Sequence, residues 1–392
     1  MFPERFSNLP AYPFSRLRIL LDAHAPGDTA APMAIGEPTH AFPQWILQII
    51  QDHSVGFNSY PPNDGTPEFR SAITAWIAQR YGVPIDPNKN VIALNGTREG
   101  LYNAAMALCP QTKAGKKPVI LTPNPFYQVY MFAALSVGAQ PEFVPATKET
   151  GFLPDYAGLE LEILDRASLA YICSPANPQG AVADRSYWQD LIRLAEKHDF
   201  RILADECYSE IYRTAPPVGA LQVAHEMGAD PDRVMIFHSL SKRSNLPGLR
   251  SGFAASGEKV ISLMKTMRAY SGAPLPLPLQ KAAEAVWLDE KHVQENRRLY
   301  VEKFALADDI FSDIAEYTSP EGGFFLWLAC QNGEEAALEL WKEDGIRVLP
   351  GRYLSQDVNN QNPGDGYIRV ALVAPKDQIE IGLRKLRNRL YR

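Results

Sequence analysis

Long hydrophobic runs and clusters of basic residues are both missing from this chain of 392 residues. No stretch approaches the roughly 20 consecutive apolar residues that a membrane-spanning helix needs, and residues 1–14 lack the apolar core of a secretory signal. Aspartate and glutamate outnumber lysine and arginine by 45 to 39, for a net charge of −6. The sequence therefore shows no excess of positive charge of the kind that binds nucleic acid or an anionic membrane. We expect a cytoplasmic protein that binds neither.

Cysteine is also scarce, at four residues in the whole chain. The four are widely spaced and each lies in an apolar stretch, which favours reduced, buried thiols over a disulfide framework. They are Cys109, Cys173, Cys207 and Cys330. We expect no metal site.

What the chain does have is an ordinary globular composition, with 46% apolar and 21% charged residues. Several short apolar runs end in polar loops, and each is followed by a longer segment with helical patterning. The clearest runs are residues 91–94, 118–121, 169–173, 201–204 and 234–237. This alternation predicts a mostly parallel sheet with helices on both faces, whose polar strand ends converge on one edge.

The pattern changes after Pro274, where a proline-rich segment is followed by a long helical stretch at 284–311 and two further strands at 322–328 and 367–373. A chain of this length is too long for one small core. We therefore expect a large domain at residues 46–280. The smaller domain is expected to combine residues 1–45 and 281–392.

Lys242 follows the predicted strand 234–237 in a polar loop that contains glycine and proline. A lysine amine acts covalently when its surroundings lower its pKa or when a carbonyl compound traps it as a Schiff base. Lys242 is therefore a candidate nucleophile, and the alternative is a solvated surface charge.

Asn95 to Gly100 lie between a predicted strand and a helix. Backbone amides at such a helix start, together with Gly96 and the hydroxyl of Thr97, can form an anion pocket; a simple helix cap is the alternative. The spacing of a dinucleotide site or a P-loop is absent, so a single phosphate is the better hypothesis.

Asp205 ends the strand 201–204. A largely desolvated carboxylate there needs a cationic partner, and a protonated pyridine nitrogen would serve; a structural ion pair is the alternative. Tyr208 and Asn177 each offer a hydrogen bond to a phenolate-type oxygen, although turn chemistry also explains Asn177 before Pro178.

Tyr127 opens the helix after the next strand, and its ring could stack on a heteroaromatic ring or lie in the core. Arg369 stands inside an otherwise apolar strand. Its planar fork matches a carboxylate, either that of a ligand or that of an internal acid.

Seven motifs, read together, resemble the class I and II aminotransferases of fold type I, which depend on pyridoxal 5′-phosphate. They lie at residues 60–70, 95–99, 124–130, 177–180, 205–212, 239–250 and 368–372. The resemblance covers nearly the whole chain. It implies an α/β fold, with a mostly parallel seven-stranded sheet flanked by helices in the large domain and a smaller α+β domain.

The resemblance also implies roles for the candidate residues. Lys242 would form a Schiff base with the cofactor and then shuttle the substrate proton, while Asp205 would keep the pyridine nitrogen protonated. Asn177 and Tyr208 would bind the ring oxygen, and Tyr127 would stack on the ring. Of these, Lys242, Asp205 and Tyr208 form the implied catalytic set.

The remaining implied contacts hold the cofactor phosphate and the substrate. The phosphate ligands would be Gly96, Thr97, Arg98, Ser239, Ser241 and Arg250. Tyr60 would reach the phosphate from the other subunit, so the family implies a homodimer with two shared active sites. Arg369 would grip the substrate carboxylate, with Asn177 and Gly36 beside it.

Within the family, motifs such as Ile-Gly-Glu-Pro-Thr-His at 35–40 are most similar to the branch that exchanges an amino group between glutamate and N-succinyl-2-amino-6-oxopimelate in lysine biosynthesis. Aspartate, aromatic or kynurenine-type aminotransferases and β-lyases remain alternatives. A sensing domain of a transcription regulator is disfavoured, because no basic helix-turn-helix pattern precedes the motifs. A long substrate with several carboxylates needs further cations, and the candidates are Arg16, Arg18, Arg98 and Arg243.

Overall fold

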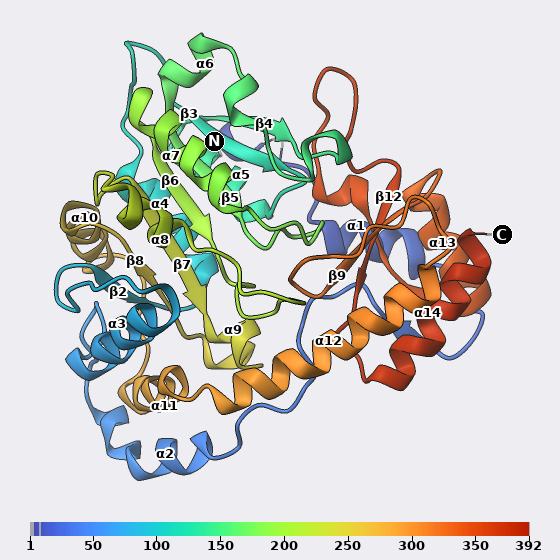
Figure 1. Ribbon diagram of the computed structural model, residues 1–392, viewed down its shortest axis with the longest axis horizontal. Coiled ribbons are helices and arrows are strands. Elements are labelled where there is room, and N and C mark those ends of the chain that lie inside the picture. The colour runs from blue at the N-terminus through green and yellow to red at the C-terminus, as the bar shows by residue number, and fades with distance from the viewer. Residues whose placement is uncertain (1–3, 8, 392) are drawn as a thin grey trace.

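The computed structural model describes residues 4–7 and 9–391. Its centre is a seven-stranded sheet in the order β2-β8-β7-β6-β5-β3-β4 (Figure 1). Only β8 runs antiparallel to its neighbours, so the predicted mostly parallel sheet is confirmed. The strands are β2 Val91–Leu94, β3 Val119–Asn124, β4 Gln140–Pro145, β5 Ala167–Cys173, β6 Arg201–Asp205, β7 Val234–Ser239 and β8 Gly252–Ala255.

The strands of this sheet are apolar because helices cover both of its faces. Along β6, Ile202 and Ala204 join one apolar cluster, and Leu203 between them joins the cluster on the opposite face. The covering helices are α3 Pro67–Tyr81, α4 Thr97–Leu108, α5 Gln128–Ser136, α6 Leu161–Arg166, α7 Arg185–Lys197, α8 Ala220–Met227, α10 Glu258–Arg268 and α11 Leu277–Leu288. Shorter helices are α2 Ile46–Asp52 and α9 Leu240–Arg243.

A second part of the molecule holds a three-stranded antiparallel sheet and a two-stranded parallel one (Figure 1). The first contains β11 Leu349–Pro350, β12 Tyr367–Ala371 and β9 Phe325–Ala329, and the second pairs β1 Ala31–Pro32 with β10 Ile346–Arg347. Its helices are α1 Pro13–Leu21, α12 Lys291–Phe311, α13 Gly333–Asp344 and α14 Lys376–Leu390. The domain boundaries themselves remain a prediction.

Short 3-10 helices occupy several connections. They are Glu4–Phe6, Ser54–Asn58, Lys148–Thr150, Tyr156–Gly158, Pro247–Leu249 and Gly351–Leu354.

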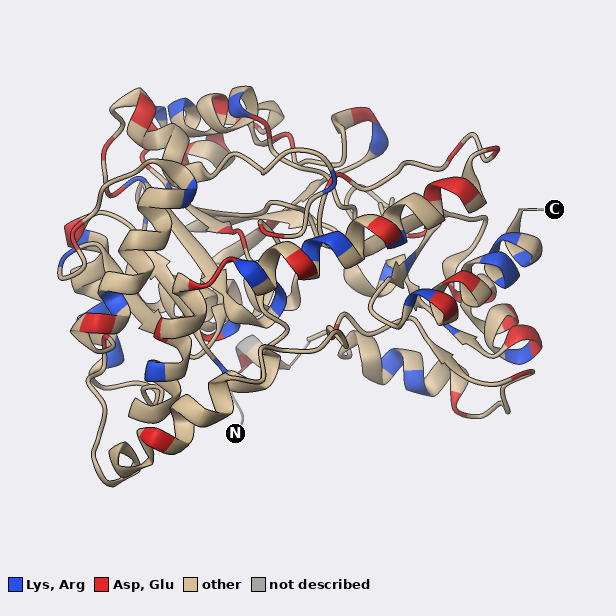
Figure 2. Cartoon of the chain, turned by 60° about the horizontal axis from the view of Figure 1, so that its bottom comes forward, with Lys and Arg blue, Asp and Glu red and all other residues tan. Residues whose placement is uncertain are grey.

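The predicted continuous helix at 284–311 is wrong, because α11 ends at Leu288 and α12 begins at Lys291. Asp289 between them is extended, with φ −101° and ψ 118°, and its carboxylate accepts a hydrogen bond from the His292 N–H at 3.1 Å. An aspartate side chain that binds a nearby backbone N–H competes with continued helix, and here it starts a new one. α12 then runs from the seven-stranded part to the second part of the molecule (Figures 1 and 2).

The four cysteines are free thiols, as predicted, but only Cys173 is buried and the other three are half-buried. Within residues 4–7 and 9–391, no helix is long and apolar enough to cross a membrane, and no cluster of three potential metal ligands occurs. Acidic and basic residues alternate along the exposed helices (Figure 2).

Trp76 on α3 is the centre of the aromatic packing under β7 and β8. Its ring lies 4.9 Å from that of Trp287, 5.0 Å from that of His238 and 6.0 Å from that of Phe253, and the residue is 2% exposed. We expect Trp76→Ala to lower the free energy of unfolding by about 3–5 kcal/mol through the cavity it leaves.

Equilibrium unfolding in urea measures this loss. Gln79→Ala, on the exposed face of the same helix, is the matched control and should change stability by less than about 0.5 kcal/mol. A Trp76→Ala protein that unfolds at the wild-type midpoint would contradict this packing.

Candidate functional site

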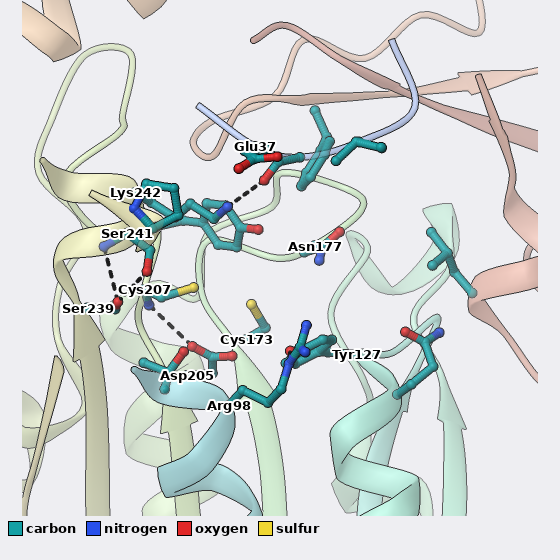
Figure 3. A pocket seen from close by; sticks show the side chains of 18 of the residues that line it. Glu37, Arg98, Tyr127, Cys173, Asn177, Asp205, Cys207, Ser239, Ser241 and Lys242 are labelled. Carbon is teal, nitrogen blue, oxygen red and sulfur yellow. Dashed lines mark hydrogen bonds between the residues drawn. The ribbon is translucent and has the colours of Figure 1, made fainter. Parts of the chain in front are cut away.

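A cavity of about 440 Å³ lies at the carboxyl ends of β5, β6 and β7. These strand ends deliver Cys173, Asp205 and Ser239, and the opposite wall carries Phe325 of β9 and Arg369 of β12. Open α/β sheets bind ligands at this edge. Figure 3 shows the labelled side chains of Lys242, Asp205, Asn177 and Tyr127 around the hollow.

Lys242, on the short helix α9, points into this cavity (Figure 3). Its Nζ donates a hydrogen bond to the carbonyl oxygen of Gly36. Burial lowers the pKa of Lys242 to about 8, and the positive charges of Arg369 and Arg250 act in the same direction. The predicted nucleophile is therefore an amine that loses its proton far more readily than an exposed lysine.

Asp205 is 3% exposed, and its carboxylate is contacted by neutral donors. The Tyr130 hydroxyl donates at 2.9 Å and the Cys207 N–H donates at 3.3 Å. Burial raises the pKa of Asp205. Neither contact is the structural ion pair that was the alternative interpretation of this residue. The Asp205 carboxylate faces the cavity, where a cationic ligand would stabilise its buried charge.

Tyr130 was not singled out by the sequence, although it stands one helical turn after Tyr127. Its ring stacks on that of Tyr171 with centroids 4.5 Å apart and planes 11° apart. The Tyr171 hydroxyl donates to the Leu101 carbonyl at 2.7 Å. This buried stack fixes the hydroxyl that contacts Asp205.

The first turn of α4 and the segment 239–250 meet on one side of the cavity. Thr97, Arg98, Ser239, Ser241 and Arg250 all line it. Of the phosphate ligands predicted from the same chain, only Gly96 is not a lining residue.

Gly96 adopts φ +82°, and a Cβ there would lie 2.5 Å from Arg250 Nη2, so only glycine lets the arginine approach. Gly96 is also the N-cap of α4, and no side chain caps this helix. Thr97 is thus not the helix cap that was its alternative role, and its hydroxyl remains available to a ligand.

Arg369 is 4% exposed and projects from β12 into the cavity. Its Nη1 donates to Asn177 Oδ1 at 3.0 Å, and Nη2 donates to the Ala34 carbonyl at 2.9 Å. Its Nε is buried without a hydrogen-bond partner among the described residues. Burial lowers the pKa of Arg369 to about 10. Both observed acceptors are neutral, so the cation calls for an anionic ligand.

Tyr208 and Tyr127 form two further walls of the cavity. The Tyr208 ring packs edge-on against Phe324 at 5.3 Å, and burial raises the pKa of its hydroxyl. Tyr127 accepts a hydrogen bond from Arg98 Nε at 2.5 Å. The N-terminal segment closes the cavity and contributes Tyr12, Phe14, Ile35 and Glu37. The motif at 35–40, with Gly36, pointed to part of this segment, whereas no motif marked Tyr12 or Phe14.

Asn296 of α12 is another contact that no motif revealed. Its Nδ2 donates to the Lys242 carbonyl at 3.2 Å, and its Oδ1 lies 2.8 Å from His40 Nδ1. The helix therefore holds both the lysine loop and the segment that follows Gly36.

Of the four candidate arginines for a distal carboxylate, Arg98 lines this cavity, whereas Arg18 and Arg243 do not. Arg243 is buried, pairs with Glu290 at 2.6 Å and donates to the Val286 carbonyl at 2.9 Å, so its predicted role is wrong. Arg18 is exposed and bonds to Ser15 at 3.1 Å. Tyr60 is also fully exposed and does not line the cavity of its own chain.

The residues present fit pyridoxal 5′-phosphate. A buried amine, a carboxylate without a cationic contact and a cluster of hydroxyl and guanidinium groups face one hollow, beside the unpartnered Nε of Arg369. These groups match an aldehyde, a protonated ring nitrogen, a phosphate and a substrate carboxylate respectively.

Comparison with known proteins agrees with this chemistry. The family model described as "Aminotransferase class I and II" matches residues 30–386. The LL-diaminopimelate aminotransferase of Dehalococcoides mccartyi (strain ATCC BAA-2266 / KCTC 15142 / 195) is 30% identical over 98% of both chains, and that of Desulforudis audaxviator is 30% identical over 99% of this chain and 98% of the relative.

Solved structures show the same likeness. An aminotransferase from Neisseria meningitidis has a TM-score of 0.94 with 36% identity, covering 99% of each chain. Aminotransferase AspB from Helicobacter pylori has a TM-score of 0.90 with 34% identity, covering 97% of this chain and 98% of that one. A probable N-succinyldiaminopimelate aminotransferase from Thermus thermophilus, at 22% identity and a TM-score of 0.83 over 96% of this chain and 99% of that one, shares the fold.

The lowered pKa of Lys242 can be tested on the apoprotein. We expect trace acetylation of Lys242 by acetic anhydride, followed by mass spectrometry, to rise with a midpoint near pH 8, because only the neutral amine reacts. A midpoint near the ordinary lysine value of about 10.4 would contradict the environment described here.

Proposed function

The chain belongs to the class I and II aminotransferases. We propose that it transfers the amino group of N-succinyl-L,L-diaminopimelate to 2-oxoglutarate, giving N-succinyl-2-amino-6-oxopimelate and glutamate, and that it also catalyses the reverse transfer. The observation that carries transamination is the convergence of Lys242, Asp205 and Arg369 on one cavity. The motifs that resemble the succinyl-diaminopimelate branch support the choice of substrate.

Members of this family use pyridoxal 5′-phosphate, which when bound supplies an aldehyde and an electron-accepting ring. In our proposal Thr97, Ser239, Ser241, Arg98 and Arg250 hold its phosphate, with the Gly96 backbone beside them. Asp205 pairs with the ring nitrogen, and the buried Tyr130 hydroxyl keeps the carboxylate in place. Asn177 and Tyr208 bind the ring oxygen and Tyr127 covers the ring.

Arg369 binds the α-carboxylate of the substrate in this proposal, because its guanidinium faces the cavity and its observed contacts are neutral. Asn177 orients that guanidinium from the side, and Gly36 contributes backbone next to the carboxylate. Lys242 carries the proton, since an amine with a pKa of about 8 can both accept and release one near neutral pH. The N-terminal segment closes the cavity and excludes water.

A homodimer with shared active sites is part of the proposal. Exposed apolar side chains occur on the 3-10 helix Ser54–Asn58, on the loop before α3 and on the loop after α10, and such surfaces are typical of association. Val55 is 75% exposed, Phe57 57%, Tyr60 102% and Tyr270 92%. Tyr60 would then complete the phosphate site of the other subunit.

Unacylated LL-diaminopimelate is the second candidate substrate, and the relatives at 30% identity favour it. Aspartate, aromatic or kynurenine-type transamination and β-elimination are alternatives with the same core residues.

A panel of amino donors assayed with 2-oxoglutarate tests the proposed substrate. We expect N-succinyl-L,L-diaminopimelate to be the donor with the highest kcat/KM, above LL-diaminopimelate, aspartate and kynurenine. Lys242→Ala serves as the control and should remain folded while losing turnover by several orders of magnitude. Strong activity with aspartate and none with the succinylated compound would refute the assignment.

A further inference from the structure

A second cavity of about 330 Å³ shares lining residues with the first, and Arg369 does not line it. Five residues form walls of both cavities, namely Tyr12, Arg98, Phe126, Tyr127 and Gln128. A ligand that fills the first cavity can therefore extend past these residues into the second. Pockets for ligands of moderate size measure roughly 300–1,000 Å³, so each cavity alone is at the small end of that range.

The charges around the second cavity have one sign. Arg16 and Arg98 line it, and among the residues that the structure describes no aspartate or glutamate does. The other walls are apolar side chains such as Val129 and Phe132, with polar groups from Gln356 and its neighbours. Such a lining suits an extended chain that ends in a carboxylate.

Arg16 is held in a defined place by two contacts. Its guanidinium carbon lies 3.8 Å from the centre of the Tyr353 ring, and its Nη2 lies 3.6 Å from a carboxylate oxygen of Glu334. A separation of 3.6 Å is longer than a hydrogen bond, so Glu334 orients the guanidinium without saturating its donors. The side chain is 30% exposed, which leaves it open to a ligand.

Arg98 stands where the cavities meet. Its Nε is committed to the Tyr127 hydroxyl, which fixes the plane of the guanidinium at the junction. The three arginines are thus distributed along one connected space, with Arg369 at one end, Arg98 at the junction and Arg16 in the second cavity.

We infer that the second cavity is the subsite for the acylated end of the substrate, and that Arg16 binds the carboxylate of the acyl group. The inference rests on the proposed function and deepens it. The free ammonium group of unacylated diaminopimelate would meet two arginines there, and the nearby Glu334 carboxylate already pairs with Arg16, so a second cation is disfavoured. Acylation by a dicarboxylic acid removes that positive charge and adds a negative one.

The first test is steady-state kinetics of the holoenzyme. We expect Arg16→Gln to raise KM for N-succinyl-L,L-diaminopimelate about tenfold to hundredfold, the loss typical of a charge-assisted hydrogen bond, with little change in kcat. KM for glutamate should not change, because glutamate does not reach the second cavity. Arg16→Lys should recover part of the loss.

Arg18→Gln is the matched control. Arg18 lies two residues further along α1, carries the same charge and lines neither cavity. We expect its KM values to equal those of the wild type. An Arg16→Gln enzyme with wild-type KM for the succinylated substrate would overturn the inference while leaving the proposed function intact.

A second test needs no turnover of the succinylated compound. Calorimetric titration of the holoenzyme with straight-chain dicarboxylates of four to twelve carbons should show a gain in affinity once the chain spans both cavities. Arg16→Gln should abolish this gain and Arg18→Gln should keep it. If the wild type does not use the succinylated compound, the proposed function fails, and this length series alone decides the subsite: a gain independent of Arg16, or no gain, overturns it.

Discussion

Asp205 and Arg369 are buried ionisable groups whose observed contacts are neutral dipoles, and the rest of the site is arranged around them. Burial of a charge is costly unless an opposite charge lies nearby. Hydroxyl, amide and backbone groups lower that cost here without cancelling the charge. Burying these two charges therefore lowers the stability of the protein. The same charges attract a cationic ring nitrogen at one wall of the cavity and a carboxylate at the other.

The seven-stranded sheet makes this arrangement precise. Cys173 and Asp205 are paired in register at the ends of β5 and β6, and Asp205 pairs with Phe237 of β7. Side chains that leave neighbouring strands at matched positions have little freedom, since helices cover both faces of the sheet. The opposite wall comes from β9, β12 and the N-terminal segment, so both parts of the molecule contribute to the cavity.

The sequence predicted the strands around the site and most of its polar residues, because short apolar runs that end in polar loops mark the edge of a parallel sheet. It could not predict side-chain direction on short helices. Lys242 and Arg243 are adjacent on α9, yet one enters the cavity and the other pairs with Glu290 in the core. Tyr130 was hidden for a similar reason, since a buried tyrosine in an apolar helix is normally a core residue.

Asn296 joins two segments that are more than 200 residues apart in the chain, the lysine loop and the irregular segment around His40. The carbonyl of Gly36, four residues before His40, is the group to which the Lys242 amine donates. Both therefore share one anchor on α12. A tilt of that helix would displace donor and acceptor together, so the hydrogen bond between Lys242 and Gly36 can persist when the two parts of the molecule shift relative to each other.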